Sequence, residues 1–249
     1  MLLGVLFFLV AALYSSVGFG GGSSYLALLI LWDVSYVIIP AIALVCNICV
    51  VSGNSLNYLR AECVNWRLLL PPTIASLPFA YLGGQMVIKK EVFVAILFAT
   101  LLIAGIRLLI NYRQYDGDIA SYKVIPILLG VAIGSILGFL SGLVGIGGGI
   151  FLAPILYNLR AGPPNKIAAT ASVFILMNSI SGLAGQLQKK DISNQLIEYW
   201  YLPLLVIVAG QIGNRITIKF IPERFIALLT ALLVLFVAAR LGWSALGNA

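Results

Sequence analysis

Two glycine-rich blocks are the residues of this sequence whose types and spacing best suit ligand binding. Residues 13–22 are LYSSVGFGGG and residues 140–149 are LSGLVGIGGG, so six of ten positions are identical at an offset of 127. Each block interrupts an apolar run, and three consecutive glycines favour an unwound backbone because glycine carries no Cβ. A helix that restarts after such a break presents free N–H groups and the positive end of its dipole. The blocks therefore predict an anion site built from backbone.

Neutral polar side chains in the apolar runs complete this predicted site. Asn47 and Asn178 occupy matching places in two runs, and an amide inside a membrane must find a partner. Ser23 and Ser24 directly follow the first block, where they could act as N-caps or as ligands. No catalytic or metal-binding residue is predicted. The predicted substrate-binding residues are Gly20, Gly21, Gly22, Ser23, Ser24, Asn47, Gly147, Gly148, Gly149, Thr170, Ser172 and Asn178.

Every member of this set also has a purely structural explanation. Glycines let helices pack closely, and we predict that role for the glycines spaced by four between residues 130 and 142. The asparagines can clamp neighbouring helices. Thr170 and Ser172, which precede Asn178 close to one helical face, can bond back to their own helix. The glycine blocks are duplicated and the spaced glycines are not, so we interpret only the blocks as a binding site.

The composition is typical of an integral membrane protein. Of the 249 residues, 61% are hydrophobic and 9% are charged, and the mean hydropathy is +1.08. Soluble domains contain about 25% charged residues. Histidine is absent, which excludes histidine-based catalytic triads, metal sites and proton relays. The sequence has no Walker A motif, and every Asp and Glu lies in or near a break between apolar runs. We therefore expect neither an enzyme nor a bound cofactor.

Eight apolar segments nearly fill the chain, and most have the roughly 20 residues that a membrane-spanning helix needs. They cover residues 2–32, 37–58, 67–88, 92–111, 123–159, 166–187, 196–218 and 223–243. The first segment lacks a positive n-region, so we interpret it as a membrane segment and not as a signal peptide. We predict an all-α integral membrane protein with two repeats of about four segments, in which segments 1 and 5 are broken or re-entrant at the glycine blocks. Residues 1–111 form the first repeat, 112–122 the connecting loop and 123–249 the second repeat.

The distribution of the fifteen Lys and Arg residues favours re-entrant glycine segments. If all eight segments span the membrane, these charges divide eight and seven between its two sides. If segments 1 and 5 instead enter and leave on one side, five charges fall on one side and ten on the other, which agrees with the positive-inside rule. The two repeats would then have inverted orientations. The five charges are Lys89, Lys90, Lys189, Lys190 and Arg240.

The second glycine block and the segment after it resemble the TauE/SafE sulfite-exporter family of membrane permeases. The matching stretches are SGLVGIGGGIFLAPIL at residues 141–156 and KIAATASVFILMNSISGL at residues 166–183. The resemblance covers essentially the whole chain, because that family is likewise a duplication of about four segments. It implies transport of small, often sulfur-containing anions such as sulfite, sulfonates or sulfoacetate. The first copy departs from the pattern, since Leu28 stands near the proline position and residues 43–44 replace the Thr and Ser.

The residues and the resemblance together predict a multi-pass secondary transporter of the plasma or inner membrane that exports such anions by alternating access. With the cell interior negative, each negative charge that leaves across 100 mV gains about 2.3 kcal/mol, so export needs no coupling ion. The alternatives are an anion channel, an importer coupled to an ion gradient, and a membrane subunit that transports nothing. The expected partners are a small inorganic or organic anion and the lipid bilayer, without nucleic acid. A homo-oligomer is compatible with the glycine faces.

Overall fold

The fold is all-α in the part of the chain that the structure describes. The structure is a computed structural model that describes residues 2–16, 18–111, 123–189 and 192–216, and residues 228, 231, 232, 235, 236, 238, 239 and 243. Every regular element within these residues is an α-helix, which confirms the predicted class. The predicted loop 112–122 and almost all of the predicted segment 223–243 lie outside the described residues. The helices are α1 (Leu2–Ser15), α2 (Gly22–Leu31), α3 (Ile39–Arg60), α4 (Trp66–Gln85), α5 (Lys90–Asn111), α6 (Ile127–Val144), α7 (Gly149–Asn158), α8 (Pro164–Gln186), α9 (Ile192–Ile197) and α10 (Tyr201–Ile216).

Each long glycine-containing segment is broken into two helices. Helices α1 and α2 replace the predicted segment 2–32, and α6 and α7 replace the segment 123–159. Glycines with positive φ begin the second helix of each pair, since Gly21 and Gly148 are the N-caps of α2 and α7 with φ of 83° and 78°. The ten residues of α2, and likewise those of α7, extend over about 15 Å, which is half the hydrocarbon thickness.

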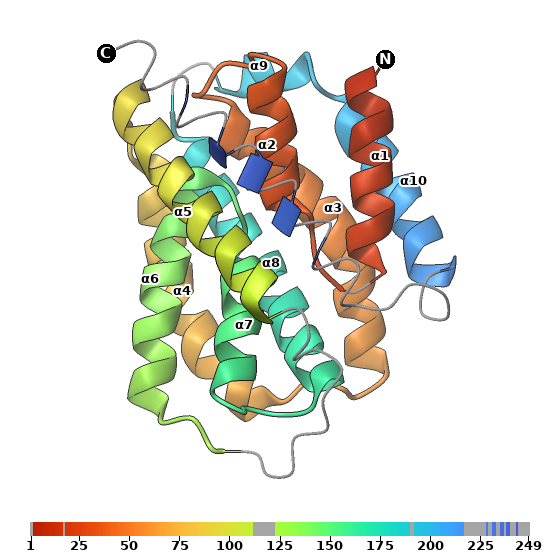
Figure 1. Ribbon diagram of the computed structural model, residues 1–249, viewed down its shortest axis with the longest axis vertical. Coiled ribbons are helices and arrows are strands. Elements are labelled where there is room, and N and C mark those ends of the chain that lie inside the picture. Colours follow the sequence, from red (N-terminus) through yellow and green to blue (C-terminus); the bar gives the residue numbers. More distant parts are fainter. Residues whose placement is uncertain are drawn as a thin grey trace.

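The two broken segments are hairpins that open at opposite ends of the molecule (Figure 1). Helix α1 runs inward from the N-terminus and α2 returns toward the same end, and the Phe7 and Tyr25 rings stack between them with centroids 4.7 Å apart. Helix α6 runs inward from the other end and α7 returns to it. There the Lys123 N–H donates to the Arg160 carbonyl at 2.9 Å, which joins the two ends of the second hairpin.

The remaining long helices pack around these hairpins in two similar sets. Helix α4 contacts α6 and α8, and α10 contacts α1 and α3, while α3 and α8 contact each other between the two sets. The spaced glycines of α6 face α4, where Gly134 lies against Pro72 and Gly138 against Ser76. Gly142 lies against the Ala80 backbone. The predicted packing role of these glycines is therefore confirmed.

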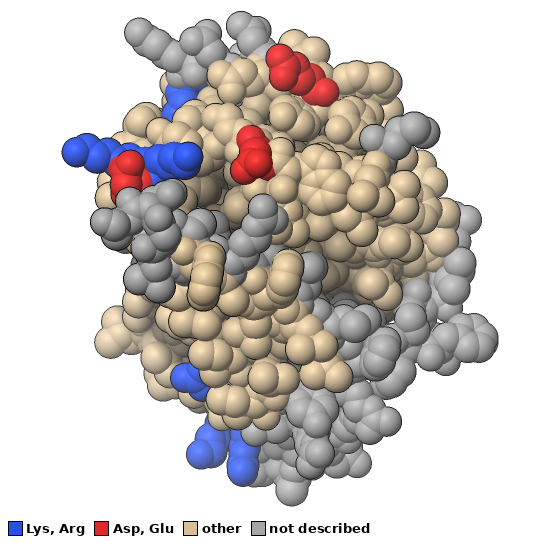
Figure 2. All heavy atoms as spheres, turned by 45° about the horizontal axis from the view of Figure 1, so that its top comes forward, with Lys and Arg blue, Asp and Glu red and all other residues tan. Residues whose placement is uncertain are grey.

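Charges gather at the two ends of the molecule, and a broad apolar band separates them. Figure 2 shows Lys, Arg, Asp and Glu on the face near the N-terminus and further basic groups at the opposite edge. Large apolar side chains of the helices are exposed, such as Ile74 and Phe79 of α4 and Leu128 of α6, which expose 64%, 41% and 80% of their surface. Three helices of the described residues are long and apolar enough to cross a membrane, namely Ile39–Arg60, Ile127–Val144 and Asn165–Gln186. An exposed apolar surface of this extent is typical of a protein that is embedded in lipid.

Gly142→Ala tests the close contact of α4 and α6. A methyl group at Gly142 would collide with the Ala80 backbone, so we expect a loss of about 1–3 kcal/mol of stability. Gly210→Ala is the matched control in a helix, because its Cβ would meet Val50 at an ordinary 3.6 Å. Thermal unfolding in detergent measures both variants. A Gly142→Ala melting temperature equal to that of the control would contradict the packing assignment.

Candidate functional site

The two glycine breaks meet in the interior of the protein. A Cβ added to Gly22 would lie 2.5 Å from the Ile146 carbonyl oxygen, so the start of α2 touches the backbone of the second break directly. Asn47 of α3 lies at the same point, with no exposed surface, and its Nδ2 donates to the Ile146 carbonyl at 3.3 Å. One side chain therefore links α3 and the first break to the second break.

Glycine is required around Asn47 because the backbone approaches the amide so closely. A Cβ at Gly20 would lie 2.5 Å from Asn47 Oδ1, and one at Gly22 would lie 2.5 Å from Asn47 Nδ2. On the other side, a Cβ at Gly147 would lie 2.8 Å from the same Nδ2. Side chains at these positions would displace the amide, so the glycines of both blocks create its pocket.

The starts of α2 and α7 carry backbone N–H groups that their own helices leave unused. In the described backbone, the first hydrogen bond at the start of α2 runs from the Tyr25 N–H to the Gly21 carbonyl, and at α7 from the Phe151 N–H to the Gly148 carbonyl. Both N-caps are glycines, and no side chain caps either helix start with a hydrogen bond. Helix geometry therefore aims free N–H groups and two positive dipole ends at the interior.

The interpretation of Ser23 and Ser24 as N-caps is wrong, because Gly21 holds that position and both serines lie inside α2. Both are buried. The Ser24 Oγ is 2.8 Å from the Tyr14 hydroxyl of α1, which closes the first hairpin. Ser23 remains in the first turn of α2, next to the free N–H groups.

The second break is surrounded by α8 and the end of α6. A Cβ at Gly147 would lie 3.2 Å from Ser179 Oγ, and one at Gly148 would lie 3.7 Å from Ser141 Cβ. Gly149 lies against Ile175 of α8. The predicted glycines of the second block therefore adjoin two hydroxyl-bearing residues that the sequence analysis did not select.

Several buried polar atoms near the two breaks have no hydrogen-bond partner among the described residues. They are Asn47 Oδ1, Asn178 Oδ1, Ser141 Oγ, Ser179 Oγ and Tyr25 Oη. An unpartnered buried polar group costs about 1–3 kcal/mol, so native proteins rarely keep several close to one another without a reason. A polar ligand entering this region would supply the missing partners.

Three of the predicted side chains form their hydrogen bonds with groups other than the glycine breaks. Asn178 is fully buried, and its Nδ2 donates to the Phe174 carbonyl of its own helix at 3.0 Å. Thr170 also bonds within α8, from its Oγ1 to the Lys166 carbonyl at 2.8 Å. The Ser172 Oγ is 3.1 Å from the Ser55 Oγ of α3. The matching asparagines thus differ, since only Asn47 has a hydrogen bond across to a glycine break.

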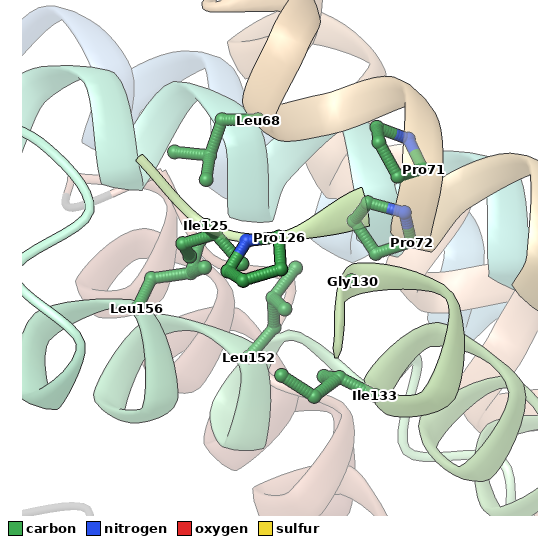
Figure 3. Close-up of a pocket in the computed structure, with 9 residues that line it drawn as sticks. All are labelled: Leu68, Pro71, Pro72, Ile125, Pro126, Gly130, Ile133, Leu152 and Leu156. Atoms are coloured by element: carbon green, nitrogen blue, oxygen red, sulfur yellow. The ribbon is translucent and has the colours of Figure 1, made fainter. Parts of the chain in front are cut away.

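A separate cavity between α4, α6 and α7 is unsuited to an anion. Figure 3 shows its lining as hydrocarbon and proline rings, and its volume is about 10 Å³. That volume is too small for more than one water molecule. The lining residues are Leu68, Pro71, Pro72, Ile125, Pro126, Gly130, Ile133, Leu152 and Leu156.

The amino-acid sequence is similar to those of known proteins over nearly the whole chain. Residues 3–241 match the family described as sulfite exporter TauE/SafE. The chain belongs to the TauE/SafE family. The TauE/SafE match confirms the resemblance inferred from the second glycine block and makes the chain a membrane transporter.

Curated relatives of this TauE/SafE protein are named as probable membrane transporters. One from Sinorhizobium fredii is 28% identical over 242 residues, which are 97% of each chain. One from Methanocaldococcus jannaschii is 31% identical over 246 residues, covering 91% of this chain and 89% of the relative. One from Bacillus subtilis is 27% identical over 111 residues, or 43% of this chain. No solved structure matches the chain.

The sequence analysis of this TauE/SafE protein missed four groups at the breaks. Tyr25 has a signal in the sequence, because a phenol within an apolar half-helix needs a partner for its hydroxyl. Ser141 and Ser179 resemble the many serines that bond to their own helices, so residue type alone does not distinguish them. The Ile146 carbonyl has no side-chain signal at all.

Asn47→Leu and Asn178→Leu test whether Asn47 alone links the two breaks. Both variants remove a buried amide of the same size, but only Asn47→Leu leaves the Ile146 carbonyl without its partner. We expect Asn47→Leu to lose about 1–3 kcal/mol more stability than Asn178→Leu, because a buried acceptor is left unpaired. Thermal unfolding in detergent compares them. Equal losses would show that the cross-break hydrogen bond contributes nothing particular.

Proposed function

We propose that this protein is a secondary transporter of small sulfur-containing anions such as sulfite or organosulfonates, and that it exports them across the plasma or inner membrane. The observation that carries the proposal is the meeting of two uncapped helix starts, α2 and α7, beside the buried Asn47 amide. The family description, sulfite exporter, supports the choice of sulfur oxyanions.

The electrostatics of the two helix starts favour an anion. Each helix start contributes about half a positive elementary charge, and N–H groups are the donors that oxyanions accept from. The side chains around the breaks are neutral amides and hydroxyls, so no carboxylate repels the ligand among the described residues there. A neutral site of this kind binds an oxyanion through backbone dipoles and releases it more readily than a pair of fixed charges would.

The central site is closed in the described conformation. Asn47 is fully buried, and the space beside Gly20 and Gly22 would not admit a single methyl group without a shift. An anion can enter only when the hairpins move apart. Because the hairpins open at opposite ends of the molecule, separation of one and then the other would expose the site alternately (Figure 1).

We further propose that residues 1–111 and 123–249 are two inverted repeats, each placing one hairpin. The contacts between the two halves support this. Helix α4 of the first half packs on α6 of the second, and α10 of the second half packs on α1 of the first. In this arrangement the end with five basic residues faces outward and the end with ten faces the cytoplasm. The protein then crosses the membrane several times. Because the cell interior is negative, the membrane potential drives anions outward, and export needs no coupling ion.

Gly22→Ala and Gly148→Ala test whether the breaks form the transport site. Each adds one methyl group at a helix start, near the Ile146 carbonyl for Gly22 and 2.9 Å from Phe174 for Gly148. We expect anion flux to fall about tenfold or more in both, which corresponds to the loss of one charged hydrogen bond. The assay is efflux from proteoliposomes with sulfite, sulfate, thiosulfate and simple sulfonates in parallel.

The control is Gly162→Ala, whose Cβ would meet only Lys166 Cβ at 3.9 Å and whose flux should match that of the wild type. Membrane insertion and melting temperature are measured for all variants. Wild-type flux that rises in proportion to substrate without saturation would indicate a channel. Unchanged flux in well-folded Gly22→Ala would remove the breaks from the transport path.

A further inference from the structure

Lys189 is a half-buried cation at the outer end of the molecule, close to the second glycine break. It lies after the end of α8 and lines a cavity of about 20 Å³ with Tyr36, Pro40, Phe93 and Leu143. Apolar side chains form most of that lining, so the ammonium group has lost part of its hydration. By contrast, Lys89 and Lys90 at the same end are exposed.

Two hydrogen bonds connect Lys189 to the end of α6. Lys189 Nζ donates to Gln186 Oε1 at 2.7 Å, and Gln186 Nε2 donates to the Gly142 carbonyl at 2.7 Å. Gly142 belongs to the last turn of α6, whose carbonyls have no partner further along the helix. That helix end is negative, and a cation placed there compensates it. Gln186 is therefore a positioning residue that fixes the ammonium group relative to the break.

The Lys189 cavity adjoins the second break through Pro40. Pro40 lines the cavity, and a Cβ added to Gly145 would lie 2.5 Å from Pro40 Cα. Gly145 begins the break with φ of 90° and directly precedes Ile146, whose carbonyl accepts from Asn47. Lys189, Pro40, Gly145 and Asn47 thus connect the outer surface to the central site.

In the other hairpin, the described partners at the matching place are neutral. Ser15 stands 127 residues before Gly142, at the offset of the glycine blocks. It donates to Asn54 Oδ1 at 3.2 Å and to the Gly210 carbonyl at 2.7 Å, so the corresponding linkage is neutral. Among the described residues, the end of α6 is therefore connected to a lysine and the end of α1 is not, so the two linkages differ in charge.

We propose that Lys189 and its cavity form an outer anion subsite, through which a sulfite- or sulfonate-type anion passes between the central site and the outside. This inference rests on the proposed transport function. The cavity of about 20 Å³ holds roughly one water molecule, so the subsite fills when the α1–α2 hairpin, which opens at this end of the molecule, moves away. The anion then replaces the neutral Gln186 as the partner of the ammonium group, and the opposite charges attract in surroundings poor in water.

Titration of Lys189 provides a readout that a merely structural lysine would not give. Burial lowers the pKa of Lys189 from its usual 10.5 to about 8, so the residue is charged below about pH 8 and neutral above it. Tyr36 is the other titratable residue in the cavity lining. The remaining described charges on this end do not line the cavity; they are Asp33, Lys89, Lys90, Glu91 and Glu198.

The experiment measures exchange of labelled sulfoacetate in proteoliposomes at equal internal and external pH between 7 and 9. Both acid groups of sulfoacetate stay ionised across this range, so the substrate itself does not titrate. We expect the wild-type KM to rise about tenfold as Lys189 loses its charge, which is the effect of one charged hydrogen bond. Lys189→Arg should show no such rise because arginine stays protonated. Lys189→Gln should have the high KM at every pH.

Lys90→Gln is the control, since it removes the same charge from an exposed position on the same end and should keep the wild-type pH profile. Melting temperatures identify any variant that fails to fold, and the wild-type and Lys189→Arg profiles still decide the question if Lys189→Gln does so. A wild type that transports sulfoacetate with a KM independent of pH, or a well-folded Lys189→Gln with the wild-type KM, overturns the subsite. Absence of flux for every sulfur anion tested overturns the proposed function itself, and the subsite with it.

Discussion

Every backbone N–H and C=O inside a bilayer must find a partner, and this requirement decides where the two helix breaks can lie. An unwound segment cannot face lipid, so both breaks are placed against each other and against α3 and α8. Asn47 meets the requirement at their contact, because its amide donates to the Ile146 carbonyl from a fully buried position. The hairpins, their glycines and the free N–H groups at α2 and α7 all follow from the position of this contact.

The same constraint explains why the site depends on glycine and neutral side chains. The backbone approaches Asn47 so closely at Gly20, Gly22 and Gly147 that any Cβ would displace the amide. A charged side chain at this depth would cost roughly 2.5–3.5 kcal/mol, whereas helix dipoles supply positive potential without a charged side chain. Lys189, the half-buried cation that Gln186 links to the end of α6, lies after the end of α8 and not at the breaks themselves.

Much of the fold could be predicted from the sequence, because composition and glycine spacing have local physical consequences. The breaks between α1 and α2 and between α6 and α7 follow from consecutive glycines, and the packing of α6 on α4 follows from glycines at intervals of four. Boundaries are less accurate, since the helix in the segment predicted to start at residue 196 begins at Tyr201, and a separate short helix, α9, ends at Ile197. Contacts between distant segments could not be predicted, because periodicity gives the face of a helix but not its neighbour.

In the candidate site, residues that look equivalent in the sequence have different hydrogen-bond partners in the structure. Asn47 and Asn178 look equivalent in the sequence, yet one donates across a break and the other to its own helix. Lys189 looks like a loop charge, and only the fold shows its connection through Gln186 to the end of α6. Internal duplication therefore predicts matching positions but not matching hydrogen-bond partners.

The central claim is that the starts of α2 and α7 together bind the transported anion. The most direct test is a structure of the protein with selenite, a heavier analogue of sulfite whose selenium can be located by anomalous scattering. We expect a selenium peak within hydrogen-bonding distance of backbone N–H groups at Gly22–Ser24 and Gly148–Ile150, beside Asn47. A protein that transports selenite but shows its selenium away from both helix starts would contradict the account.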